Sequence, residues 1–330
     1  MKRKISFPDK DVIISRLKKI NYKRKGVAFL AALLKYVVLA SIGYLVLYPL
    51  VYMVSFSIRP YSDYIDPAIY WIPKHLSNIQ FSNAQRVIDF IPSIKNSLIF
   101  EVLSAFIEVI TCSIVAYGMA RFKFRGKGIL TVLLFAMIIL PEQMIIIPKM
   151  INYSNLDFLG IIRLTNKIFG TNIKISILNT GFAFWLPSLF GVGLKAGIII
   201  FIYMQFYKGL PKELEEAAWI DGANLTQTYL RISLPSSSVV LATVIILSVI
   251  WHWNDYYLAV MYTSKAESMP IAVKIAQMQT SLQTIGIWNG PYHVGARCAA
   301  CLAFVAPMLV MYIILQRKFV QSIDRVGITG

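Results

Sequence analysis

The chain has 330 residues, of which 57% are hydrophobic and 15% charged, and its mean hydropathy is +0.62. A soluble domain of this length cannot bury so much apolar side chain, so the composition excludes a soluble globular protein and indicates a membrane protein. The net charge of +17 is distributed between apolar stretches and forms no single basic face, which argues against nucleic-acid binding.

Residues 1–35 form a basic N-terminal segment ahead of the first apolar stretch. Within residues 1–26, ten Lys and Arg stand against two acids, and Ile13, Leu17 and Ile20 recur at helical spacing. Two interpretations remain open: a short amphipathic helix on anionic lipid, or a solvated tail that only fixes orientation. The basic region is too long for a cleavable signal peptide, and no small-residue cleavage site follows the apolar stretch.

Six apolar stretches follow, and each approaches the length of about 20 residues that a transmembrane helix needs. They run over residues 36–58, 94–120, 129–148, 187–207, 237–262 and 295–315. Together they predict an all-α membrane domain over residues 36–315.

The charges between these stretches predict the orientation of the chain. Basic residues crowd segment 121–128 and the tail 316–330, whereas acids balance the bases in segment 59–93. The positive-inside rule therefore places both termini in the cytoplasm of a multi-pass plasma-membrane protein, and segments 59–93, 149–186 and 263–294 outside. The outer segment 149–180 is long and only modestly apolar. It is either an insertion that contacts an external partner or a re-entrant or surface-lying helix pair, and we favour the partner contact.

Residues 208–236, between the fourth and fifth stretches, predict a cytoplasmic helix, a turn and a second helix. Pro211 suits the first helical turn, and acids at 213, 215 and 216 complement the positive end of the helix dipole. Ala217 and Ala218 are expected to keep one face shallow enough for close approach by another surface.

The second half of this loop contains stop and start signals. Gly222 can take a left-handed conformation and end the first helix, while Asn224 can cap the second. Pro235 is expected to stop the second helix before the next span. Such a helix pair, presented by two spans, is suited to docking in a groove of another protein.

Three residue clusters in the loop carry a family resemblance. They are Glu216-Ala217-Ala218, Asp221-Gly222-Ala223 and Ile232-x-Leu234-Pro235. At these spacings they resemble the EAA loop of binding-protein-dependent ABC importer permeases. The sequences NSL at 96–98, AYGMARFKFRGKG at 116–128, WND at 253–255 and MPIAV at 269–273 resemble the carbohydrate-type permeases, similar to the second permease of the maltose transporter. The resemblance covers about residues 30–325, with a longer outer insertion and a tail that follows the family only loosely.

The resemblance implies the six-helix type I ABC importer permease fold with a cytoplasmic EAA coupling helix pair. In that family the loop seats in a cleft of the nucleotide-binding subunit, so that ATP-driven closure rocks the membrane helices. The implied partners are a second homologous permease, two ATP-binding subunits that carry ATP and Mg²⁺, and an extracellular or periplasmic solute-binding protein.

The implied cargo is an oligosaccharide or a sugar derivative. An importer of polyamines or peptides with the same loop is the alternative. An ion-coupled secondary transporter is disfavoured because no inverted repeat is visible.

The residues expected to couple to the ATPase are Glu216, Ala217, Ala218, Asp221, Gly222, Ala223, Ile232, Leu234 and Pro235. Asn254 and Asp255 are polar groups within an apolar stretch, where an ionisable group costs about 2.5–3.5 kcal/mol. They either line the translocation path or make packing hydrogen bonds. Both interpretations remain open, with His252 and Trp253 as expected packing neighbours.

Three further ionisable residues lie in the apolar stretches. Lys195 is expected in the fourth span, with its side chain extended to the headgroups. Glu101 and Glu108 share one face of the second span and leave open the same choice between a path and a packing role.

The sequence lacks a phosphate-binding loop, a zinc-protease motif and a nucleophile elbow. It therefore predicts neither ATP hydrolysis nor another enzymatic activity, and no cofactor or metal bound by this chain. Cys298 and Cys301 form a C-x-x-C without a second pair or a nearby histidine, and Cys112 lies in another apolar stretch. All three are expected to be buried structural thiols.

Overall fold

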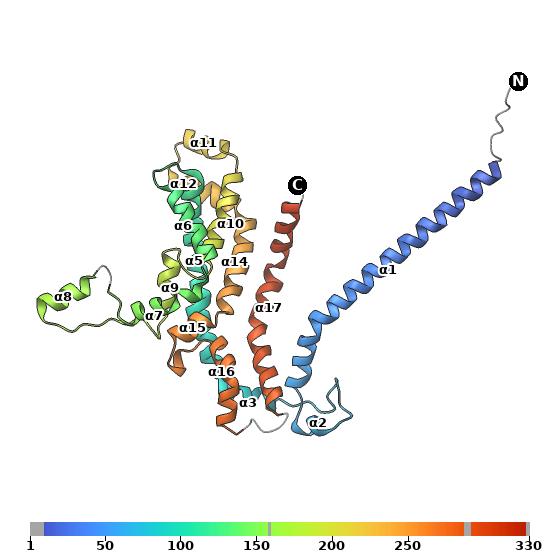
Figure 1. Cartoon of the computed structure of the whole chain (residues 1–330), viewed down its shortest axis with the longest axis horizontal. Coiled ribbons are helices and arrows are strands. Elements are labelled where there is room, and N and C mark those ends of the chain that lie inside the picture. Colours follow the sequence, from blue (N-terminus) through green and yellow to red (C-terminus); the bar gives the residue numbers. More distant parts are fainter. Residues whose placement is uncertain (1–9, 158–159, 287–291, 328–330) are drawn as a thin grey trace.

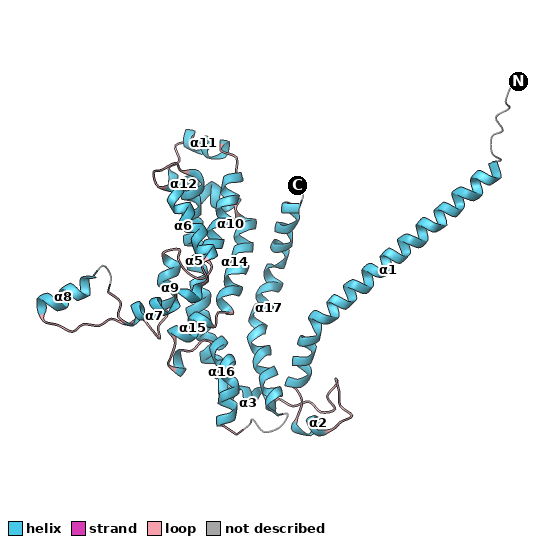
Figure 2. Cartoon of the chain, viewed as in Figure 1, coloured by secondary structure: helices cyan, strands magenta, loops and turns pink. Residues whose placement is uncertain are grey.

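The computed structural model describes the backbone of residues 10–157, 160–286 and 292–327, and the side chains of residues 26–157, 160–286 and 293–316. Every regular element in these ranges is a helix (Figure 2). Helices suit apolar stretches in a bilayer because all their backbone hydrogen bonds are made within the segment. The predicted all-α class is confirmed for this part of the chain.

The first helix, α1 (Lys10–Ser57), is continuous from the basic N-terminal segment through the first apolar stretch. It leans away from the bundle, and only the C-terminal part of α1 meets the last helix, α17 (Tyr292–Gly327) (Figure 1). The choice between a lipid-bound helix and a solvated tail depends on Ile13, Leu17 and Ile20, whose side chains lie outside the described set.

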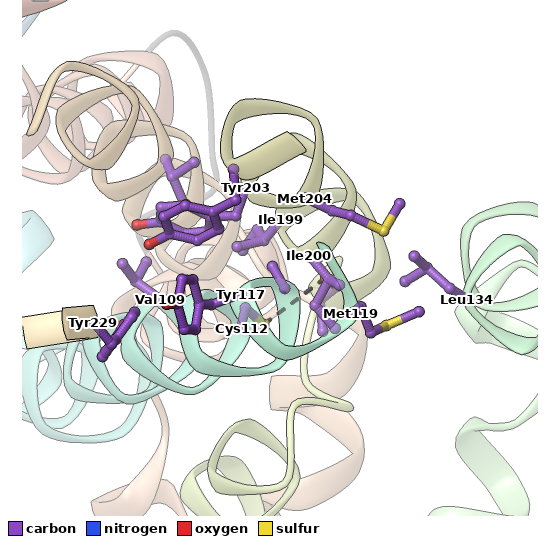
Figure 3. Close-up of a cluster of buried hydrophobic side chains, with 14 residues drawn as sticks. Val109, Cys112, Tyr117, Met119, Leu134, Ile199, Ile200, Tyr203, Met204 and Tyr229 are labelled. Carbon is purple, nitrogen blue, oxygen red and sulfur yellow. Dashed lines mark hydrogen bonds between the residues drawn. The ribbon is translucent and has the colours of Figure 1, made fainter. Parts of the chain in front are cut away.

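The centre of the bundle is α5 (Leu103–Arg121), which packs on α9 (Phe182–Leu189), α10 (Ala196–Gly209) and α14 (Ser238–Trp253). Figure 3 shows the apolar cluster between α5 and α10, which includes Cys112, Ile199 and Met204. Two of its phenols share one partner: the Ser113 hydroxyl is 2.8 Å from that of Tyr207, and Tyr229 donates to Ser113 at 2.9 Å.

Three stretches in the described chain are long and apolar enough to cross a membrane alone, residues 26–57, 90–121 and 293–316. The second combines α4 (Phe90–Asn96), a π-helix (Ser97–Val102) and α5. Residues 225–236 and 238–253 pass the same length and hydropathy test only when taken together, and their two helices meet at 78°. The last crossing helix is longer than expected, because α17 continues past Leu315.

The expected third span is wrong in its boundary. It is the short helix α6 (Lys127–Ile139), which ends at Ile139 rather than near Pro148. Leu140 is extended (φ −71°, ψ 123°) because Pro141 follows it and disfavours the helical conformation. A 3₁₀ turn (Glu142–Met144) then leads into α7 (Ile146–Ser154).

The fourth and fifth expected spans are broken rather than continuous. Residues 190–195 separate α9 from α10, with positive φ at Gly191 (67°) and Lys195 (62°). The sequence led us to expect Lys195 inside the fourth span. This expectation is wrong, because Lys195 precedes α10. In the fifth stretch, α14 ends at Trp253 and the short α15 (Tyr257–Tyr262) begins after a gap. Asn254 and Asp255 thus lie at a helix break.

The end of the bundle away from the 208–236 loop is built from short helices (Figure 1). They are α2 (Tyr61–Ile65), α3 (Ile79–Ile88), α16 (Ile271–Thr284) and the 3₁₀ turn Ala266–Ser268. Ile88 of α3 packs with Met278 of α16 and Ala299 of α17 in one cluster. A side arm formed by α7 and α8 (Ile161–Phe169) leaves the bundle laterally.

Loop 59–78 is closed by the Asp63 carboxylate. Its Oδ2 accepts hydrogen bonds from the backbone N–H groups of Lys74 (2.8 Å) and His75 (3.0 Å), and its Oδ1 lies 3.0 Å from His75 Nδ1. The hydrogen bond from the His75 side chain, with the two backbone bonds, lowers the pKa of Asp63 below its ordinary value.

We expect this loop to loosen in acid. Because the folded-state pKa of Asp63 is depressed, its contribution to stability is complete above the unfolded pKa of about 3.9 and is lost as pH falls through the folded pKa. Amide hydrogen exchange over residues 61–77, corrected for intrinsic rates, should show protection at pH 5 that falls below pH 4. In Asp63→Asn this acid-dependent loss should disappear, and an unchanged pH profile in that variant would contradict the assignment.

Candidate functional site

The predicted helix–turn–helix of the 208–236 loop is confirmed. The first helix, α11 (Glu213–Ile220), ends before Gly222, which has φ +82°. The second, α12 (Leu225–Thr228), starts with a capping box: Asn224 Oδ1 accepts from Gln227 N–H at 2.8 Å, and Gln227 Oε1 accepts from Asn224 N–H at 2.9 Å.

The chain returns to the membrane through a π-helix (Tyr229–Ser233) and α13 (Leu234–Ser236). Pro235 was expected to stop the helix, but the helix continues through it to Ser236. Pro235 occupies one of the first positions of α13, where its missing N–H costs no bond. The 78° bend falls at Ser237 instead, immediately before α14.

One face of α11 is packed inward and the opposite face is free. Glu215 and Ala218, three residues apart, are buried, and Ala218 is 7% exposed. Glu216 and Ala217 are exposed, and Ile220 is 86% exposed. The expected shallow face therefore contains Ala217 but not Ala218, because the inward direction is set by the partner of Glu215.

That partner is Arg121, the last residue of α5. Its Nε donates to Glu215 Oε1 at 2.8 Å, and the two side chains are 6% and 5% exposed. Arg121 Nη1 also donates to the carbonyl oxygen of Leu210 at 3.0 Å, and Ser233 Oγ donates to Glu215 Oε1 at 3.2 Å. One buried ion pair thus ties both limbs of the loop to the central helix.

This pair was not predicted from the sequence, in which Glu215 was assigned to the helix dipole and Arg121 to a basic loop. Glu215 and Ala218 are three residues apart, a spacing that places two side chains on one face of a helix. Nothing in the sequence shows that this face turns toward the end of a helix about 90 residues earlier.

A second polar group lies within the bundle around Glu108. Its Oε2 is 3.4 Å from His252 Nε2 and accepts from Ser188 Oγ at 3.1 Å, and Ser188 Oγ is 2.7 Å from Ser104 Oγ. His252 Nδ1 lies 2.9 Å from the Ser248 carbonyl oxygen and must donate to it, because a carbonyl only accepts. The other ring nitrogen, Nε2, is the one that faces the Glu108 carboxyl group.

Two more carboxyl groups lie near this pair. Glu101 is 1% exposed, and neither of its oxygens has a hydrogen-bond partner among the described residues. Asp255 Oδ1 accepts from the N–H of Leu258, in the first turn of α15, at 3.2 Å, while its Oδ2 has no hydrogen-bond partner among the described residues. Both residues line a cavity of about 20 Å³, together with Lys149 and His252, which has room for one water-sized molecule.

Asn254 faces a more open groove of about 220 Å³. The lining residues are Glu142, Gln143, Ile146, Leu194, Lys195, Trp251, Asn254, Asp255, Tyr256, Tyr257 and Leu258. Asn254 Nδ2 also donates to the carbonyl of Ile250 at 2.8 Å, which is the packing hydrogen bond that the sequence left open. The path role stays a prediction. The backbone N–H of Lys195 donates to Glu142 Oε1 at 3.0 Å. This bond connects the break between α9 and α10 to the 3₁₀ turn that follows α6.

The expected packing neighbours are confirmed as buried. Trp253 stacks on Phe304 of α17 at 5.7 Å and donates from Nε1 to its carbonyl at 3.1 Å. Cys112 and Cys298 are buried and Cys301 is half-buried, and all three are free thiols. The expectation of buried thiols is therefore correct for the first two and only partly so for Cys301.

The chain resembles known transport proteins along most of its length. A family model described as binding-protein-dependent transport system inner membrane component matches residues 87–325, which include the loop and the polar cluster. The chain is 27% identical over 286 residues to the probable ABC transporter permease protein YurM of Bacillus subtilis, covering 86% of this chain and 84% of that protein. It is 26% identical over 285 residues to the diacetylchitobiose uptake system permease protein DasC of Streptomyces coelicolor, covering 86% and 92%.

A solved structure shares the fold. A chain of a bacterial ABC transporter involved in the import of the acidic polysaccharide alginate superposes with a TM-score of 0.67 at 18% identity, covering 96% of this chain and 100% of that chain. The expected permease fold is thereby confirmed.

We expect the Arg121–Glu215 pair to hold the loop shut against protease. Removing one partner of a buried ion pair costs about 3–5 kcal/mol, because the other charge stays buried and unpaired. In Arg121→Gln, tryptic cleavage at the exposed Lys208 and Lys212 should accelerate about a hundredfold or more. Adding Glu215→Gln should restore much of the protection, and Arg125→Gln should leave cleavage unchanged. Equal cleavage in the Arg121 and Arg125 variants would show that the pair does not hold the loop.

A second expectation concerns Gly193, which closes over the Glu108 cluster. A Cβ at this position would lie 2.0 Å from Glu108 Oε2 and 2.6 Å from Ser188 Oγ. Gly193→Ala should therefore destabilise the chain by about 1–3 kcal/mol through overpacking. Thermal unfolding in detergent measures the effect. Gly209→Ala, which meets no atom within 4 Å, is the control and should unfold as the unaltered chain does. Matching curves for the two variants would mean that the Glu108 cluster is loosely packed.

Proposed function

Because the chain belongs to the family of binding-protein-dependent transport system membrane components, we propose that it is one permease subunit of an ATP-driven ABC importer that carries carbohydrate. Members of this family are membrane components of transport systems, not enzymes. The carbohydrate cargo is supported by the names of similar proteins, which refer to diacetylchitobiose, to trehalose and maltose, and to starch degradation products. These names favour an oligosaccharide or sugar derivative over a polyamine or a peptide.

The main support for the proposal is that α11 has one buried face and one exposed face. Its inner face is fixed by the Arg121–Glu215 pair, and its outer face presents Glu216, Ala217 and Ile220, which no described element of the chain covers. An exposed helix face of this kind can dock in a groove of another protein. We place the ATP-binding subunit on that face, with ATP and Mg²⁺ bound by the partner.

The turn after α11 completes this docking surface. Asp221 and Gly222 are exposed, and Ala223 is half-buried, so the second residue cluster of the loop forms its tip. The third cluster lies in the limb that returns to the membrane, where Ile232 and Leu234 are half-buried and Pro235 is exposed. In the proposed mechanism this limb carries motion of the tip through the 78° bend to α14.

The full assembly would contain a second permease, two ATP-binding subunits and an external solute-binding protein. The arrangement of the chain supports a cytoplasmic position for both termini, since the N-terminal end of α1 and the C-terminal end of α17 lie at the same end as α11 (Figure 1). A structure of the alginate transporter in complex with a periplasmic protein that carries an alginate pentasaccharide supports the last partner by analogy.

The groove that Asn254 and Asp255 line is the proposed wall of the translocation path. It lies at the helix break between α14 and α15, where backbone and side-chain polar groups reach an open surface. Irregular backbone at membrane depth is tolerated where it lines a cavity or is covered by protein. Amide, carboxylate and tyrosyl groups there can hydrogen-bond passing hydroxyls, and the second permease would supply the opposite wall.

Position 217 tests where the ATP-binding subunit docks. In the assembled importer, a cysteine-reactive crosslinker on Ala217→Cys should capture the ATP-binding subunit. The same reagent on Ile72→Cys, which is 83% exposed in the segment between α2 and α3, should not, because these two helices lie at the end of the bundle opposite α11 (Figure 1). Capture by both variants, or by neither, would reject the docking surface.

The turn itself offers a second test. Gly222 has φ +82° and donates its N–H to the Trp219 carbonyl at 3.1 Å, and proline can satisfy neither condition. Gly222→Pro should insert normally in the membrane but lose association with the ATP-binding subunit and sugar uptake. Gly222→Asn, which tolerates the left-handed conformation, is the matched control. Co-purification and uptake at control level in the proline variant would overturn the coupling role.

A further inference from the structure

The side arm has a fixed base and a free tip. At the base, Leu156 N–H donates to the Ile175 carbonyl at 2.8 Å, and Ile177 N–H donates to the Tyr153 carbonyl at 3.0 Å. Ile146 and Ile177 are buried there in a cluster with Tyr262. Beyond this base, α8 extends sideways from the bundle, at the level of α9 and α15 (Figure 1).

The tip keeps its shape through polar contacts. Asn166 Oδ1 accepts from Ile173 N–H at 2.9 Å and from the Thr171 hydroxyl at 2.8 Å, while its Nδ2 donates to the Ile173 carbonyl at 2.9 Å. These bonds hold the returning chain against one side of α8. The returning chain therefore does not cover the apolar face of the helix.

The uncovered face is regular and apolar. Ile161, Leu164 and Ile168 recur at helical spacing and are 55%, 58% and 64% exposed. The opposite face carries Arg163, which is 89% exposed, and the exposed Lys167. Such a division into an apolar and a basic face is typical of helices that lie in the plane of a membrane interface.

The charge of the arm complements an anionic surface. Residues 155–178 contain Arg163, Lys167 and Lys174 against the single acid Asp157. Arg163 Nε lies 3.8 Å from Asp157 Oδ2, so this acid partly neutralises one base. Lys167 and Lys174 are exposed and carry the excess positive charge of the arm.

We propose that α8 lies in the boundary between headgroups and acyl chains of the leaflet farther from α11. Its apolar face enters the acyl region, and Lys167 and Lys174 bind anionic phospholipid headgroups. A lipid surface fits better than a protein, because α2, α3 and α16 extend farther from α11 than the arm does (Figure 1). A protein that docks on that end of the bundle would meet those helices first. The inference depends on the membrane location of the chain and not on the identity of its cargo.

Nitroxide labels on the two faces of α8 test the proposal in the full-length chain. Ile168→Cys and the adjacent Lys167→Cys are labelled separately and reconstituted in vesicles of phosphatidylcholine and phosphatidylglycerol at a ratio of about 3:1. The unaltered chain, with its three native cysteines, supplies the background signal. Power saturation then compares the accessibility of each label to oxygen, which concentrates in lipid, and to a water-soluble nickel chelate.

We expect the label at 168 to be several-fold more accessible to oxygen than to the nickel chelate, and the label at 167 to show the reverse ratio. Lys167→Gln combined with Lys174→Gln should move the label at 168 toward water, and Lys208→Gln should not. Equal nickel accessibility at 167 and 168 would overturn the proposal. So would protection of position 168 that appears only after addition of the importer's solute-binding protein, because the face would then be a protein contact.

Discussion

The ion pair between Arg121 and Glu215 is the contact on which the proposed coupling between the loop and the helix bundle depends. Arg121 ends α5, the helix that packs against α9, α10 and α14 at once. Arg121 donates to Leu210 and to Glu215 in the first half of the loop, and Ser233 in the returning limb donates to the same Glu215 oxygen. The ion pair therefore joins both limbs of the loop to α5. In the proposed mechanism, a force applied to the free face of α11 would therefore reach the centre of the bundle.

The polar interior explains where the bundle is irregular. Ser104 and Glu108 of α5 face Ser188 and His252, which lie next to the breaks after α9 and α14. At these breaks the backbone leaves helical geometry, so its polar groups need partners or a cavity. The groove beside Asn254 is in the same place. The helix breaks and the proposed path thus lie beside the buried polar groups of α5.

The sequence predicted the features that depend on local chemistry. Gly222 in the left-handed region, the Asn224 cap and the helix pair of the loop follow from short-range backbone and side-chain preferences, and the spacing of the three clusters indicated the family. Hydropathy located the apolar stretches but averaged across Pro141, Gly191 and Asn254, where the helices end. The inward burial of Ala218 and the pairing of Glu215 with Arg121 depend on contacts distant in sequence. No periodicity within the loop could reveal them.

The proposed coupling through the Arg121–Glu215 pair requires α11 and α5 to move as one body during the transport cycle. Spin labels at Ala217→Cys on α11 and Ile110→Cys on α5, two exposed positions, measure this directly by pulsed dipolar spectroscopy in the assembled importer. The account predicts one narrow distance distribution that is the same without nucleotide and with ATP trapped, and that broadens in Arg121→Gln. A distance that shifts between the two nucleotide states in the unaltered pair would contradict it.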